Sequence, residues 1–109
     1  MIRLNNNGYG YYHLKDTDTQ SYLGRCIVYD KRNFYEIWGV VIYDRFRKQG
    51  YATLMLKRII KKFADKPLRL YVYKDNNIAI RLYEKLGFKI IEEYAPYNDG
   101  NYNAWTMER

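Results

Sequence analysis

The strongest constraint on the fold is a segment of helical periodicity that lies between two segments with strand character. Apolar residues recur at the i, i+3, i+4 and i+7 positions over residues 52–63, and lysines fill the positions between them, as in a helix buried on one side. Pro67 ends this helix because its ring cannot continue the helical hydrogen bonds. Residues 34–42 and 68–73, before and after it, are rich in apolar and aromatic residues. This order excludes purely helical and purely β-sheet classes.

Two polar clusters divide the chain before that helix into three segments rich in tyrosine, isoleucine and valine. The clusters lie at residues 16–20 and 30–33, so we predict three antiparallel strands joined by two turns. The third segment, 34–42, is apolar at nearly every position, which indicates a central strand covered on both faces. Gly39 within it indicates a bulge, a close approach of another backbone, or simply tight packing. Glu36 is its only charge.

A second helix and two further strands are predicted in the last third of the chain. Asp75 or Asn76 can cap the helix, and Gly87 suits the left-handed conformation that commonly follows a helix end. Residues 89–94 and 103–107 have strand character. The expected fold is therefore an α/β (α+β) fold, with a mixed, mainly antiparallel sheet of about six strands and two main helices.

Length and composition limit the possible classes of function. A chain of 109 residues has the size of one domain, so we expect a single domain over residues 1–109. Cys26 and His13 are the only residues of their kinds, which excludes an internal disulfide and a zinc site of cysteines and histidines within one chain. We expect no metal. The sequence has neither the roughly 20-residue apolar run of a membrane helix nor a secretory signal, so we expect a cytoplasmic protein that does not bind membranes.

The basic charge is concentrated in one segment. Residues 45–69 contain nine lysines and arginines but one aspartate, in a chain whose net charge is +7. Arg47, Lys48 and Gly50 come just before the first predicted helix. The start of a helix offers free backbone N–H groups and the positive end of the helix dipole, which suit a phosphate group. Taken alone, these residues are more typical of a solvated turn before an ordinary helix.

A second motif supports the phosphate interpretation. Residues 76–88 read N-N-I-A-I-R-L-Y-E-K-L-G-F, and residues 47–52 read R-K-Q-G-Y-A. Together they resemble the GNAT superfamily of N-acetyltransferases, which has an R/Q-x-x-G-x-G/A loop for the pyrophosphate of coenzyme A and a later N-x-x-A-x-x-L-Y-x-x-x-G-F motif. The fixed positions of the second motif are occupied by Asn76, Ala79, Leu82, Tyr83, Gly87 and Phe88. The resemblance covers residues 34–88 firmly and the last strands loosely.

The resemblance implies an enzyme that uses acetyl-CoA as cosubstrate and transfers the acetyl group to a primary amine. The coenzyme-binding residues that it implies are Val40, Val41, Ile42, Arg47, Lys48, Gln49, Gly50, Tyr51, Ala52, Thr53, Asn76 and Tyr83. Backbone groups of residues 40–42 would pair with the pantetheine arm, and residues 48–53 would surround the pyrophosphate. Asn76 would contact the coenzyme or serve only as a helix cap.

The same resemblance implies two catalytic residues. Tyr83 matches the family tyrosine that protonates the departing thiolate; a phenol of pKa about 10 keeps its proton at neutral pH and can still donate it. Its alternative role is that of a core aromatic residue. Glu36 matches the general base of the histone-acetyltransferase branch, which removes a proton from an amine of pKa about 10.4 before attack. We expect apolar neighbours around Glu36; an ion pair with a lysine and a water-mediated base are the alternatives. Other branches place the base where this chain has Tyr71.

The N-terminal part of the sequence suggests which kind of acceptor the protein uses. The two helices that usually wall the acceptor site of this family have no counterpart in it, which predicts a minimal first strand and an open, shallow site. An open site favours a lysine or an N-terminus of a protein as the acceptor. Tyr94, Tyr97 and Tyr102 are candidates for lining it or are exposed loop residues without a role.

Two alternatives to a protein acceptor stay open. One is an N-acetyltransferase for a small amine, such as a polyamine, an aminoglycoside or an amino acid, which loop closure or a second subunit in a homodimer would enclose. The other is a non-enzymatic module that binds nucleic acid through basic residues of the first helix, namely Lys57, Arg58, Lys61 and Lys62. The sequence supports nucleic acid less well, because a solvated helix face beside a coenzyme site explains the same residues.

Overall fold

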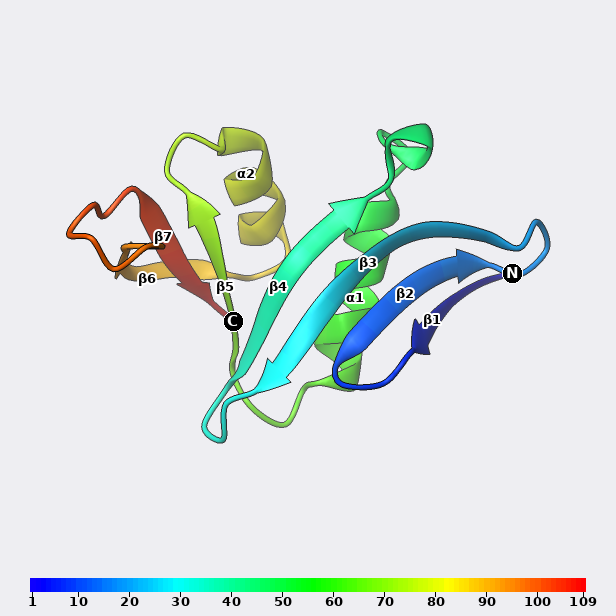
Figure 1. Cartoon of the computed structure of the whole chain (residues 1–109), viewed down its shortest axis with the longest axis horizontal. Helices are drawn as coiled ribbons and strands as arrows, with labels where there is room; N and C mark the ends of the chain where they lie inside the picture. The colour runs from blue at the N-terminus through cyan, green and yellow to red at the C-terminus, as the bar shows by residue number, and fades with distance from the viewer.

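The computed structural model describes residues 1–109 and contains one seven-stranded sheet with two helices (Figure 1). The strands are β1 (Ile2–Asn6), β2 (Tyr11–Asp16), β3 (Ser21–Asp30), β4 (Tyr35–Ile42), β5 (Leu68–Tyr73), β6 (Lys89–Tyr94) and β7 (Ala104–Glu108). The helices are α1 (Tyr51–Lys62) and α2 (Asn77–Lys85), and a short 3-10 turn, η1 (Asp44–Phe46), precedes α1. The predicted fold class and both helices are confirmed. The sheet has one strand more than the six expected, because residues 2–6 pair fully with β2.

The strand order is β1-β2-β3-β4-β5-β7-β6, which places β4 in the middle of the sheet. Neighbouring strands run antiparallel except β4 and β5, which are parallel because α1 connects them as a crossover. This connection carries the chain from the antiparallel half, β1 to β4, to the C-terminal half. The sheet is therefore mixed and mainly antiparallel, as predicted.

Both helices pack on the same face of the sheet. Alternate residues of the strands point to that face, including Ile37 of β4 and Leu70 of β5, and join one buried cluster with Met55 of α1 and Tyr83 of α2. Figure 1 shows α1 passing behind β3 and β4. Helix α1 buries its apolar stripe against this face. Neither helix is long and apolar enough to cross a membrane.

The opposite face of the sheet has no helix over it, and this corrects one expectation. The central strand was predicted to be covered on both faces, yet Ile37 is its only fully buried residue. Trp38, the next residue, points to the other face and is 37% exposed. A run of apolar residues therefore does not require two covered faces here, because one of them is made of aromatic side chains that stay partly open to solvent.

The two halves of the sheet separate between β4 and β5. These strands pair over three residues only, Tyr35 to Leu68, Glu36 to Arg69 and Ile37 to Leu70. Beyond Ile37 they diverge, and Figure 1 shows α2 beside the gap that opens. The divergence begins at Gly39, which has φ +59° and forms a bulge, since residues 39 and 40 lie opposite Cys26 alone. Of the alternatives that the sequence left open at Gly39, the structure therefore shows the bulge.

Candidate functional site

A groove of about 610 Å³ lies where β4 and β5 diverge, and it is bordered by both helices. This volume is within the range of sites for small molecules and cofactors. The lining residues are Val40, Val41, Ile42, Phe46, Arg47, Lys48, Gly50, Tyr51, Ala52, Thr53, Asn76, Ile78, Ala79, Leu82 and Tyr83. All of the predicted coenzyme-binding residues except Gln49 are therefore brought together around one groove.

The wall from β4 offers unpaired backbone groups. Val41 and Ile42 pair with Arg25 and Gly24 of β3 on one side, whereas no pairing with β5 extends past Ile37. One edge of the central strand is consequently open toward the groove. An extended amide-containing chain can add to such an edge as a further strand does.

The N-terminus of α1 forms the end of the groove. Gly50 caps this helix in a left-handed conformation (φ +82°) without a side-chain hydrogen bond. The backbone N–H groups of Tyr51, Ala52 and Thr53 have no acceptor within the helix, and its first turn carries no acidic residue. Such a helix end is suited to a phosphate.

The loop before α1 holds its shape through its own side chains. Lys48 has φ +62°, an uncommon conformation for a residue other than glycine. Arg47 donates through Nε to the carbonyl oxygen of Ile42 at 3.0 Å, and its Nη2 lies 3.0 Å from the Asp44 carboxylate. Arg47 thus braces the turn between β4 and α1, while Lys48 forms no ion pair and contributes free positive charge at the groove.

Tyr83 points from α2 into the groove. It is 9% exposed and packs edge-on against Phe88, with ring centroids 6.1 Å apart. Burial raises the pKa of its phenol above 10, so the hydroxyl keeps its proton at neutral pH. The Asn76 side chain accepts a hydrogen bond from the Ala79 N–H at 3.2 Å, so Asn76 caps α2 and lines the groove as well. Both sequence interpretations of Asn76 thus fit its position.

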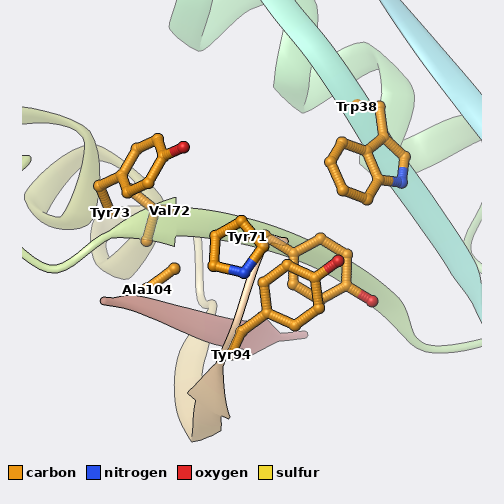
Figure 2. A pocket seen from close by; sticks show the side chains of 7 residues that line it. Trp38, Tyr71, Val72, Tyr73, Tyr94 and Ala104 are labelled. Atoms are coloured by element: carbon orange, nitrogen blue, oxygen red, sulfur yellow. The ribbon is translucent and has the colours of Figure 1, made fainter. Parts of the chain in front are cut away.

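A second, smaller cavity of about 100 Å³ lies on the helix-free face. It is lined by Trp38, Tyr71, Val72, Tyr73, Tyr94, Pro96 and Ala104. Figure 2 shows Trp38 reaching from β4 toward the pair Tyr71 and Tyr94. The ring centroids of Tyr71 and Tyr94 are 4.1 Å apart in a stacked arrangement, and those of Trp38 and Tyr71 are 5.0 Å apart. Of the three loop tyrosines considered in the sequence, Tyr94 lines this cavity, whereas Tyr97 and Tyr102 do not and are exposed.

Glu36 lies beside this aromatic cavity and has polar partners, not the apolar neighbours expected. Its Oε1 accepts a hydrogen bond from Trp38 Nε1 at 2.8 Å, and its Oε2 accepts one from the Tyr71 hydroxyl at 2.6 Å. The Lys31 ammonium is 3.9 Å from Oε1, the weak ion pair that the sequence left open. Burial, and then the bond to Glu36, raise the pKa of Tyr71, so this phenol remains a donor. The carboxylate is therefore fixed in orientation.

Several lining residues were not anticipated. In the groove these are Phe46, Ile78, Ala79 and Leu82; Ala79 and Leu82 had been noted as motif positions but not as lining residues. In the smaller cavity they are Trp38, Tyr71, Val72, Tyr73, Pro96 and Ala104. Strand alternation places Trp38 on the face of Glu36, and this signal could have identified it. The approach of Tyr71 depends on the register between β4 and β5, which the sequence does not display. No cluster of histidine, cysteine or acidic side chains with the arrangement of a metal site is present.

Comparison with known proteins gives one consistent result. The model of the acetyltransferase (GNAT) family matches residues 2–88. Over 104 residues the chain is 30% identical to the [ribosomal protein bS18]-alanine N-acetyltransferase of Haemophilus ducreyi. The aligned region covers 90% of this chain and 72% of that protein. Among solved structures, Ard1 from Thermoplasma volcanium superposes with a TM-score of 0.77 and 26% identity, covering 92% of this chain and 69% of that one.

A further relative is matched over a small part of its length. The chain is 39% identical over 70 residues to the mycothiol acetyltransferase of Corynebacterium aurimucosum, which is 61% of this chain but 23% of that protein. The shared region is thus one part of a longer relative. Since the family model covers most of the chain and the fold agrees, the chain belongs to the GNAT acetyltransferase family.

Proposed function

We propose that this protein transfers the acetyl group of acetyl-CoA to a primary amine, and that the acceptor is a lysine or an N-terminus of a protein. The observation that carries the proposal is the groove, which joins the free N-terminus of α1 to the open edge of β4 and is lined by Tyr83. Glu36 lies on the same strand, β4, and faces the opposite side of the sheet. Membership of an acetyltransferase family supports it.

The residues present fit acetyl-CoA. The N–H groups at the start of α1, with Lys48, would hold the pyrophosphate. The open edge of β4 at residues 40–42 would pair with the amides of the pantetheine arm. When bound, the coenzyme supplies an activated thioester. Tyr83 stands beside the groove with a protonated phenol and would donate its proton to the sulfur that leaves.

The acceptor amine would approach from the other face of the sheet. The cavity of Trp38, Tyr71 and Tyr94 presents aromatic rings, which attract an ammonium group. Glu36, held by Trp38 and Tyr71 at its edge, would accept the proton that the ammonium must lose before nitrogen attacks, directly or through one water. Base and acid would thus act from opposite sides of the gap between β4 and β5.

The open face favours a macromolecular acceptor. No helix covers the smaller cavity, so the site does not enclose a small amine on all sides. The similarity to an enzyme named for the alanine of a ribosomal protein supports the same choice. A terminus or a lysine on a protein surface can reach an open cavity without being surrounded.

Two measurements test the proposal. Acetyl-CoA and free CoA, each at about 100 times its Kd, should stabilise the fold by about 2.7 kcal/mol, which raises the melting temperature by roughly 10 °C. Mass spectrometry of a peptide library incubated with isotopically labelled acetyl-CoA should find the label on primary amines. The absence of any shift at millimolar coenzyme, with no labelled peptide, would refute the proposal.

A further inference from the structure

The helix-free face of β1 to β4 carries a row of exposed aromatic rings. Tyr11, Tyr22, Tyr29 and Trp38 are between 37% and 48% exposed. The strand register puts them on one side: Tyr11 pairs with Ile27, Ile27 pairs with Trp38, and Tyr29 pairs with Glu36. Since large aromatic residues are costly to leave in water over a continuous area, such a face indicates a surface that binds a partner.

The same face is basic. The side chains of Arg3, Lys15, Arg25 and Lys31 project from it, according to the register and to the contacts of Lys15 with Tyr22 and of Lys31 with Tyr29. Its only carboxylate is Glu36, whose oxygens accept hydrogen bonds from Trp38 and Tyr71. Arg25 and Lys15 take part in no ion pair of the molecule. Net positive charge thus remains available for an anionic partner.

Arg25 connects this face to the site. Its Nη1 lies 3.3 Å from the point that a Cβ atom on Gly39 would occupy, so the guanidinium extends over the bulge where β4 and β5 begin to diverge. Glu36 and Trp38, on the same strand as the bulge, border the aromatic cavity. A partner held on this face would therefore have its acceptor amine close to the gap.

We infer that the helix-free face of β1 to β4 binds an acidic polypeptide segment of the acceptor protein, with Arg25 and Lys15 as its principal contacts. The inference rests on the proposed function, because the bound segment delivers the amine. Guanidinium and ammonium groups pair with aspartate and glutamate, and the aromatic rings pack against the aliphatic parts of the same segment.

A second copy of this chain fits the face poorly. A symmetric dimer would bring the same surface of both subunits together, and Arg25 and Lys15 of one would face those of the other. Like charges placed opposite each other destabilise an interface. Single-stranded nucleic acid has complementary charge and stacks on aromatic rings, but it lacks the aliphatic primary amine that the proposed reaction requires, so it is kept as an outcome of the test.

The test compares two peptides with the same first residues and length, one with four acidic residues after the amine and one with neutral residues there. For the acidic peptide KM should be about 3- to 20-fold lower, the range expected for two exposed charge pairs, and 0.5 M salt should remove the difference. The double variant Arg25→Gln, Lys15→Gln should lose the preference. The control Lys57→Gln, Lys61→Gln makes the same charge change on the exposed side of α1 and should keep it.

The outcomes separate the two proposals. Equal KM values for the two peptides, or equal loss in the control variant, would overturn the acidic-segment inference and leave acetyl transfer intact. Fluorescence anisotropy of the labelled acidic peptide decides the matter even if turnover is slow, since binding must weaken in the Arg25, Lys15 variant. Binding of a labelled single-stranded RNA at this face, without binding of the acidic peptide, would also overturn the inference in favour of nucleic acid. Lack of stabilisation by coenzyme, together with the absence of any labelled peptide, would refute the proposed function itself.

Discussion

The two sides of the gap between β4 and β5 are built in different ways. On the helix-covered side, the polar groups that the groove offers include backbone groups: the open edge of residues 40–42 and the free N–H groups at the start of α1. On the helix-free side, the small cavity is formed by aromatic side chains from separate strands, with Glu36 fixed beside them. The first arrangement suits the coenzyme, which we propose binds there, and the second suits the proposed acceptor. Substitutions should therefore separate coenzyme effects from acceptor effects.

The largest expected effect is at Tyr83. Tyr83→Phe removes the hydroxyl and keeps the ring that packs on Phe88, so the fold should be retained. Loss of a general acid should lower kcat by about 10- to 1000-fold. The shift in melting temperature with acetyl-CoA should be nearly unchanged, because the groove keeps its shape. Full turnover by this variant would exclude Tyr83 as the acid.

Glu36→Gln probes the other side of the gap with an effect of comparable or smaller size. The amide keeps the shape of the side chain but cannot accept a proton, and it presents an N–H₂ group to a donor, either Trp38 Nε1 or the Tyr71 hydroxyl. We expect kcat to fall about 10- to 1000-fold, while binding of free CoA in calorimetry stays within about twofold. An equal loss of CoA binding would contradict the separation of the two sides.

The sequence predicts the groove on the helix-covered side better than the cavity on the helix-free side, because the two are built in different ways. Residues 47–53 and 76–88 are local motifs, and the groove is assembled from them and one strand, so all but Gln49 of the predicted residues line it. The proposed acceptor side depends on strand register: Tyr71 reaches Glu36 only because Glu36 pairs with Arg69 in the parallel ladder. Tyr71 was noted only as a position where a base is missing, and its role as a donor to Glu36 could not be read from the sequence.

In the rest of the fold, too, features set by neighbouring residues were predicted, and features set by residues distant in the sequence were not. Helix ends were predictable because Asn76 caps α2 through its own side chain and Gly87 takes φ +95° beyond it. The prediction that β4 is covered on both faces was wrong, because an apolar pattern shows that a segment is hydrophobic but not which elements pack on each of its faces. The strand at residues 2–6 was missed as a full strand because its polar composition has little strand character, and pairing with β2 stabilises it.

A substitution at Gly50 tests whether the backbone conformation at the start of α1 matters for binding of acetyl-CoA. Gly50 has φ +82°, and a Cβ atom there would meet nothing within 4 Å, so Gly50→Ala adds backbone strain alone. A left-handed alanine costs about 1–2 kcal/mol, so KM for acetyl-CoA should rise roughly 5- to 30-fold as the loop relaxes, with kcat at saturation nearly constant. Gly8→Ala is the matched control, with φ +92° and open space but no place in the groove. A similar change of KM in the control would mean that general destabilisation is responsible.

The smallest expected effect is at Tyr71, where it tests whether the orientation of Glu36 matters. Tyr71→Phe keeps the ring contacts with Trp38 and Tyr94 and removes one of the two donors to the carboxylate. Because Trp38 Nε1 still holds Oε1, we expect kcat/KM for the acceptor to fall only about 3- to 10-fold, with no change in KM for acetyl-CoA. Tyr94→Phe makes the same chemical change on the stacked ring, which donates no hydrogen bond to Glu36, and should have a smaller effect. If the two variants behave alike, the aromatic surface and not the hydrogen bond to Glu36 governs the acceptor side, and Tyr71 acts there only by packing.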